Sequence, residues 1–295
     1  MNNLQIFEHK TKSRFKKDIS LFLTILIFGV LLISDNLLAQ GNLIIFPKRV
    51  IFEGNQRFHE LNLANTGHDT ARYVISFVQI RMKEDGGFEN ITTPDSGQYF
   101  ADSFLRIFPR SVTLGPGESQ LLKIQLTKTD QITQSEYRSH LYFRSVPDKA
   151  PLSLAATDTV KDTTAIGIRI VPVFGMTIPI IIRSGESTTI VKLTDLSFEM
   201  LNDSTAAVKM TINRAGNMSI YGDISVDYIS KDGKITEIAK VQGIAVYTPN
   251  MIRRCLIQLN NVPGIDFHNG KLHLTYSAQR EDRVSKIAEA ELQLQ

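Results

Sequence analysis

The sequence predicts an all-β protein made of two antiparallel β-sandwich domains. Beyond the first forty residues, short runs of β-branched and aromatic residues alternate with polar ones, turn signals separate these runs, and no helical period connects them. The chain has 295 residues, 42% of them hydrophobic and 21% charged. This length and composition are sufficient for two domains, each with its own core.

The first forty residues form a separate segment, predicted to be an export signal. Five basic residues between Lys10 and Lys17 precede Ile19–Ile33, an uncharged and mainly apolar run of fifteen residues. A membrane span needs about 20 residues, so this run is short for one. Segment 1–40 is therefore predicted to be cleaved near Gln40 or Gly41, with no stable membrane insertion afterwards. An uncleaved anchor is the alternative.

Neither charge nor cysteine content indicates a special class of protein. The formal net charge is +3, and without the first forty residues it falls to +1, which gives no reason to expect nucleic acid as a partner. The single Cys255 cannot form a disulfide within the chain. It lies in an alternating run, and we interpret it as a small buried apolar residue.

Residues 41–184 are predicted to form the first domain. Turn signals such as Asn65-Thr66-Gly67 and Leu114-Gly115-Pro116-Gly117 bound its strands. The expected strands are Leu43–Phe52, Phe58–Ala64, Ala71–Met82, Phe104–Phe108, Leu121–Leu126 and Tyr137–Val146. The segment between Pro147 and Ile166 is rich in Thr, Ala and Asp, and a long surface loop is expected there.

This domain ends in the stretch Ile166–Arg183, which has a period of two and many β-branched residues, as a strand does. One face of it begins with Ile166, Ile168, Ile170, Pro172 and Phe174. Pro172 and Pro179 have no N–H to give to a sheet, so we expect an edge strand that breaks or bulges near Gly175, or that lacks a partner on each side in turn. A long apolar edge of this kind needs a cover or a partner.

Residues 185–295 are predicted to form the second domain, after a linker at Ser184-Gly185-Glu186-Ser187. The Asp-Gly pair at residues 232–233 is a hairpin signal. The expected strands are Ile190–Met200, Ala206–Ile212, Ile220–Ile229, Ile235–Tyr247, Ile252–Leu259, Leu272–Ala278 and Val284–Leu294. The last of these runs contains good helix formers, so a helix is the alternative there.

The sequence shows no arrangement typical of an enzyme. No P-loop, dinucleotide-binding glycine pattern or nucleophile elbow occurs, and no pair among the six histidines has zincin spacing. His268 and His273 are interpreted as structural or exposed residues. We therefore predict a protein that is not an enzyme, with no catalytic residues, no cofactor and no metal site.

The first domain resembles the PapD-like periplasmic chaperones of the chaperone–usher pilus systems. The segments that carry the resemblance are Arg49–Gly54, Leu61–Asn65, Ile107–Pro109, Leu114–Gln120, Tyr137–Pro147 and Ile166–Phe174. They cover most of residues 42–183, whereas the second domain resembles the family only in length and strand content. The resemblance implies two immunoglobulin-like β-sandwich domains, a periplasmic location, and fimbrial or pilus-type subunits as partners. An outer-membrane usher is a further partner that it leaves open.

The resemblance also implies a mechanism, donor-strand complementation. A pilus subunit is an immunoglobulin-like sandwich that is one strand short, and the chaperone lends an edge strand whose alternate side chains fill the exposed groove. The predicted donor residues are Ile166, Ile168, Ile170, Pro172 and Phe174, with a register defined to within two residues. Two alternatives stay open: this face packs inside its own domain, or the protein is a structural or adhesive pair of immunoglobulin-like modules.

In this family, two basic residues between the domains hold the subunit's C-terminal carboxylate. Arg49 matches the first of them, and a charge-assisted pair suits that role. The second is a lysine, whose position falls here on Pro179, and no lysine occurs from Asp162 to Arg183. Another basic residue could replace it, or the client could be held differently. A plain surface arginine is the alternative for Arg49.

Overall fold

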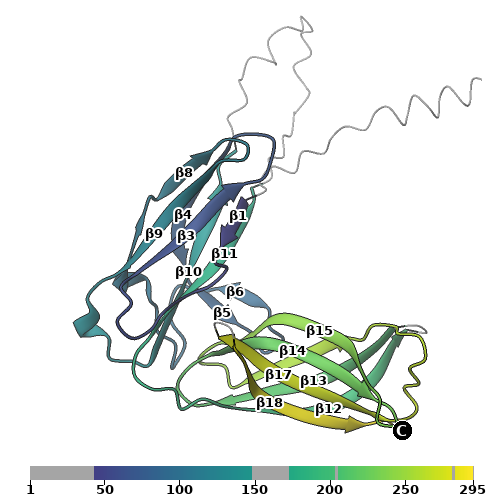
Figure 1. The fold of residues 1–295 in the computed structure, drawn as a ribbon. Helices are drawn as coiled ribbons and strands as arrows, with labels where there is room; N and C mark the ends of the chain where they lie inside the picture. The colour runs from purple at the N-terminus through teal and green to yellow at the C-terminus, as the bar shows by residue number, and fades with distance from the viewer. Residues whose placement is uncertain (1–42, 148–172, 203–204, 281–282, 295) are drawn as a thin grey trace, which may run out of the picture. The chain divides into compact units, whose positions relative to one another are not determined.

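The structure is a computed structural model, and it describes residues 43–147, 173–202, 205–280 and 283–294. In these ranges the chain forms β-strands and two short 3-10 helices, Asp102–Phe104 and Thr129–Gln131, with no α-helix (Figure 1). The predicted class, an all-β protein of two immunoglobulin-like β-sandwich domains, is confirmed. The domain boundary expected at residues 184–185 stays a prediction.

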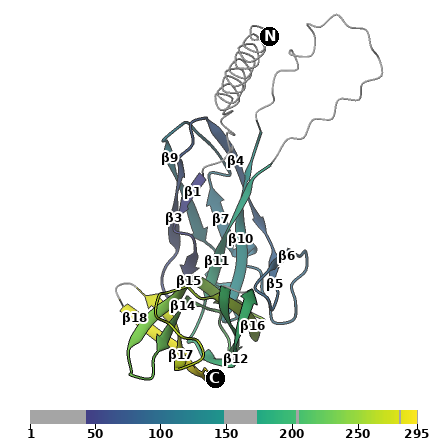
Figure 2. The ribbon, with the colours of Figure 1, turned by 90° about the vertical axis from the view of Figure 1, so that its right-hand side faces the viewer.

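The first sandwich consists of two sheets and a small hairpin. One sheet has the order β1 (Leu43–Phe46), β3 (Phe58–Asn65), β9 (Ser119–Leu126), β7 (Leu105–Phe108). The other has the order β2 (Val50–Phe52), β11 (Gly175–Arg183), β10 (Glu136–Ser145), β4 (Ala71–Val78), β8 (Ser111–Leu114). The hairpin consists of β5 (Ile80–Met82) and β6 (Phe88–Asn90). In Figure 2, β10 and β11 lie side by side, in agreement with their antiparallel pairing.

The core of this sandwich follows from the period of two along its strands. Leu61 and Leu63 of β3, and Leu122 and Ile124 of β9, alternate with exposed neighbours and are completely buried. They belong to one cluster with inward residues of the second sheet. Burying an aliphatic side chain contributes about 1.5–3 kcal/mol, so this alternation holds the two sheets together.

Two strands expected in the first domain are wrong in detail, and two short strands were missed. Leu43–Phe52 is not one strand, because the chain leaves one sheet after β1, passes through Pro47, and enters the other sheet as β2. Ala71–Met82 is likewise divided after Val78, since its last residues pair with β6 instead of β10. Strands β6 and β8, of three and four residues, are not predicted from the sequence.

The second sandwich also has two sheets around its own core. One has the order β12 (Ile190–Asn202), β13 (Thr205–Ala215), β16 (Ile252–Gln258); the other has the order β15 (Ile235–Val246), β14 (Ile220–Ile229), β17 (Lys271–Arg280), β18 (Arg283–Gln293). The final run of the chain is a strand, as predicted, because β18 pairs along β17. Cys255 packs against this core but is only half-buried.

Candidate functional site

One row of side chains along β11 begins in the first core and ends outside it. Ile178, Ile180 and Ile182 share one face of the strand and are at most 3% exposed. Two positions further along the same row, Met176 is 40% exposed, and Phe174 beyond it is 44% exposed. Because alternate residues of a strand share a face, the apolar row continues past the point where the domain's own core ends.

The strand pairing of the β11 backbone also decreases from its C-terminal to its N-terminal end. Strand β10 pairs with it from Gly175 to Arg183, whereas β2 pairs with it only at Ile180–Ile182. The side of Gly175–Pro179 that faces away from β10 therefore has no strand partner among the described residues, and we call this side the free edge. Pro179, which has no N–H to give, is the first residue outside the pairing with β2.

The hydrogen bonding between β11 and β10 continues as far as Phe174. The Ser145 N–H donates to the Phe174 carbonyl oxygen at 2.8 Å, and the Phe174 N–H donates to Ser145 Oγ at 2.9 Å. The strand itself begins at Gly175, where the sequence predicted a break or bulge. A Cβ on Gly175 would lie 2.3 Å from an atom of the Tyr142 ring, so a residue with a side chain does not fit there without a shift.

Only one of the predicted donor residues lies in a described range. Phe174 is exposed and continues the apolar row of β11. Ile166, Ile168, Ile170 and Pro172 lie outside the described residues, so their contacts and their register stay predictions.

Arg49 stands immediately before β2 and is not a surface arginine. All three of its guanidinium nitrogens are buried, and none has a hydrogen-bond partner among the described residues. The group lies between two aromatic rings, with Cζ 4.5 Å from the centroid of Tyr221 and 5.5 Å from that of Tyr247. Burial lowers the pKa of Arg49, and nearby Arg183 lowers it further.

Two more basic residues lie beside Arg49, and the sequence analysis did not single them out. Arg138 and His140 of β10 are 2% and 4% exposed. Arg138 Nη2 donates to the Thr248 carbonyl oxygen at 3.2 Å, whereas its Nε and Nη1 have no partner among the described residues. Its Cζ lies 4.3 Å from the centroid of Tyr247. We call Arg49 and Arg138 the cation cluster, and His140 lies beside them.

The pKa values of Arg138 and His140 are lowered by burial and by the charges of their neighbours. Burial lowers the pKa of Arg138 to about 10, and Arg49 contributes to the lowering. The pKa of His140 falls to about 3 because of burial and then because of Arg138 and Arg49. His140 Nδ1 also has no partner among the described residues. A site with this charge and these unused donors suits an anion.

A second charged group lies next to the cation cluster, at the C-terminal end of β11, and its members are fully paired. Buried Glu136 accepts hydrogen bonds from Arg183 Nε at 3.0 Å, Thr248 Oγ1 at 3.0 Å, the Ser219 N–H at 2.9 Å and Ser219 Oγ. Arg183 also donates to Glu53 at 3.0 Å and to the Ser219 carbonyl oxygen at 2.7 Å. This group therefore leaves no guanidinium nitrogen of Arg183 unused.

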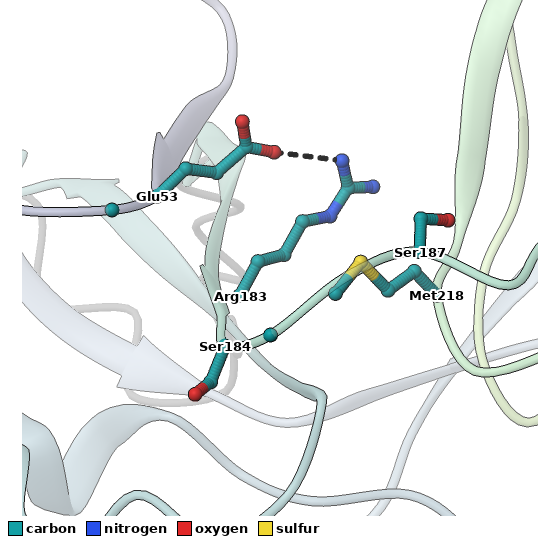
Figure 3. A pocket seen from close by; sticks show the side chains of 7 residues that line it. Glu53, Arg183, Ser184, Ser187 and Met218 are labelled. Carbon is teal, nitrogen blue, oxygen red and sulfur yellow. Dashed lines mark hydrogen bonds and ion pairs between the residues drawn. The ribbon is translucent and has the colours of Figure 1, made fainter.

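A pocket of about 360 Å³ lies beside this paired group (Figure 3). Figure 3 shows the Arg183 guanidinium directed at Glu53, with Ser187 and Met218 on the other side. The pocket is lined by Glu53, Gly54, Arg183, Ser184, Gly185, Ser187 and Met218. Since Arg183 is already paired, the pocket offers an incoming anion no unused cation.

The described residues contain neither a metal-binding cluster nor a membrane-spanning helix. No group of three or more His, Cys, Asp or Glu is placed to hold a metal ion in the described part of the chain. Within the same ranges, no helix has the length and apolar character to cross a membrane.

Comparisons with known proteins give similar folds but no sequence family. No family model and no curated protein matches the sequence. The chain is similar in structure to the YadV chaperone, with 13% identity, a TM-score of 0.43, and 86% of this chain and 100% of that chain covered. It is also similar to a chain of the CsuC–CsuE chaperone–tip adhesion subunit pre-assembly complex of Acinetobacter baumannii, with 11% identity, a TM-score of 0.43, and 84% and 99% covered.

A third similar structure is a chain of the Salmonella enterica SafA pilin complex with the SafB chaperone, with 14% identity, a TM-score of 0.39, and 86% and 96% covered. All three are chaperones or chaperone complexes of the kind that the sequence resembles. At these identities and TM-scores, the likeness says nothing about what this chain binds.

Proposed function

We propose that this protein is a periplasmic chaperone of the PapD-like family that binds and caps fimbrial or pilus-type subunits and delivers them for surface assembly. It would lend β11, together with the residues before it, to a subunit that is one strand short. Delivery to an outer-membrane usher, export through a cleaved signal at residues 1–40, and action without catalysis belong to the same proposal.

The observation that supports it best is the change along β11. Between Ile178 and Phe174 the apolar row leaves the core, and from Pro179 onwards in the same direction the backbone has no second strand partner among the described residues. A subunit lacking a strand needs both features, backbone groups for its ladder and alternate apolar side chains for its groove. Each buried aliphatic or aromatic side chain would contribute about 1.5–3 kcal/mol before ordering costs, so a few such residues are sufficient to hold a client.

Arg49 is proposed to hold the client's C-terminal carboxylate. Its guanidinium is buried and has unused donors, and burying hydrogen-bond donors without a partner is unfavourable. A carboxylate would supply the missing charge and accept two parallel hydrogen bonds.

The test is capture of a co-expressed pilus-type subunit from the same organism. We expect the double variant Ile168→Asp with Ile170→Asp to lose the co-purified subunit while keeping the thermal unfolding midpoint of the parent. Leu121→Asp is the matched control, since Leu121 is 50% exposed on β9 of the other sheet.

Unfolding of the double variant would contradict the proposal, because it would place these isoleucines inside the protein's own core. Unchanged capture by a folded double variant would also contradict it. That second outcome would favour the rival function, a structural or adhesive protein of two immunoglobulin-like modules.

A further inference from the structure

We infer that Arg138 is the second cation that holds the client's carboxylate, beside Arg49 and in place of a lysine on the lent strand. The inference rests on the proposed function and names a residue that the sequence analysis left open. It is carried by three features of the cation cluster: unused donors, cross-strand register, and a shared aromatic ring.

The unused donors set Arg49 and Arg138 apart from Arg214 and Arg183. Arg214 is 5% exposed, and its Nε and Nη1 donate to the carbonyl oxygens of Asn250 at 2.8 Å, Gly216 at 2.9 Å and Met218 at 3.0 Å. Arg183 is paired in the same complete way with Glu136, Glu53 and Ser219. Five guanidinium nitrogens of Arg49 and Arg138 have no such partner among the described residues. Buried polar groups are rarely left unpaired, so an external acceptor is expected.

The register places Arg138 where the lysine would otherwise reach. Arg138 lies directly opposite Ile181 and His140 directly opposite Pro179, the position on which the lysine falls. Residues directly opposite each other in a sheet have side chains on the same face. Arg138 and His140 therefore share a face with Pro179, and a cation from β10 replaces one from β11.

A shared ring brings the two arginines to one place. Tyr247 lies 5.5 Å from Arg49 Cζ and 4.3 Å from Arg138 Cζ, so both guanidinium groups contact the same phenol. Like charges this close repel each other, and Arg49 lowers the pKa of Arg138 as a result. One carboxylate with two oxygens would relieve this repulsion and accept from both groups.

Access to the pair depends on an aromatic cover. The Tyr221 ring lies over Arg49 and is itself 43% exposed, so it stands between the guanidinium and solvent. Exposed side chains change rotamer on the picosecond to nanosecond timescale, and rotation of this ring would uncover Arg49.

The experiment measures affinity for one purified pilus-type subunit in two forms, with a free and with an amidated C-terminus. The parent chain should bind the free form about 10- to 100-fold more tightly, as expected for hydrogen bonds to a charged group. Arg138→Gln should lose this preference and Arg138→Lys should restore part of it. Arg106→Gln on β7, an exposed arginine of the other sheet, should leave the preference unchanged.

A second readout separates a binding role from a structural one. Removing a buried, poorly paired charge should leave the thermal unfolding midpoint of Arg138→Gln equal to or above that of the parent. If Arg138→Gln unfolds, the amidated subunit still tests the site, because it leaves the chaperone unchanged.

The outcomes keep the two proposals apart. If Arg49→Gln removes the preference and folded Arg138→Gln keeps it, the inference on Arg138 is wrong and the proposed function stands. If the parent chain shows no preference for the free carboxylate, both arginines lose their assigned role while strand donation stands. If neither form binds, the proposed function itself fails.

Discussion

At its C-terminal end, β11 completes the first domain, and at its N-terminal end the same strand leaves that domain. Residues 180–182 pair on both sides and carry buried isoleucines, whereas residues 175–177 pair on one side and carry exposed Met176. Charge does not follow this division, because Arg183 is fully paired whereas Arg138, directly opposite Ile181 in the doubly paired part, has unused donors. The difference divides β11 into a part that holds the first domain together and a part that, under the proposed function, is offered to a client.

The largest effect should come from Glu136→Ala, at the C-terminal end of β11. This change leaves Arg183, Ser219 and Thr248 without a shared buried acceptor, so the free energy of unfolding should fall by about 3–5 kcal/mol in urea denaturation. Glu53→Ala is the matched control, because Glu53 pairs with the same arginine but its side chain is 50% exposed. Its effect should stay within about 1 kcal/mol. Equal losses in both variants would contradict the assigned difference.

The next largest difference should separate two residues of the same row. Ile180→Ala removes a fully buried side chain and should lower the free energy of unfolding by about 2–5 kcal/mol. Met176→Ala changes a side chain that is 40% exposed and should stay within about 0.5 kcal/mol. Chemical denaturation of both variants measures these changes in the free energy of unfolding. A comparable loss for Met176→Ala would show that the buried core does not end at Ile178.

The smallest effect concerns pH and lies between the two ends, at His140. Arg138, Arg49 and the rings of Phe88 and Tyr247 surround this side chain, and its pKa is lowered to about 3. Below about pH 6.5 the unfolded chain therefore takes up a proton that the folded chain does not, and stability falls as pH falls. Between pH 7 and 5 the loss from this group should be about 2 kcal/mol.

His140→Phe, which keeps a ring in that place, should lack this part of the pH dependence. Urea denaturation at both pH values checks it by comparing slopes, whatever the variant's absolute stability. Parallel pH dependence in the two proteins would mean that His140 does not titrate as assigned.

Much of the fold could be predicted because it depends on local pattern. Alternation along the sequence predicted most of the strands, whereas the grouping of Phe174 with Ile166, Ile168, Ile170 and Pro172 stays a prediction. The sheet change between β1 and β2 could not be predicted, because Leu43–Phe52 is apolar enough to be read as one strand and the choice of sheet is tertiary.

The candidate site was only partly predictable for a similar reason. Arg49 was found through resemblance, but its burial depends on Tyr221 and Tyr247, far away in sequence. Arg138 and His140 carried a signal that could have been used, two basic residues on one face of an otherwise buried strand. The sequence pattern could not predict that this face of β10 packs against Tyr247.

Strand β2 has only three residues, and this shortness has a consequence. Because the chain crosses between sheets before Val50, β2 ends its pairing at Ile180 and no further. Each residue added to the N-terminal side of β2 would pair with one more residue of β11. That residue could then no longer pair with a strand of another protein. The point near Pro47 at which the chain changes sheets thus determines how many residues of β11 keep one side unpaired.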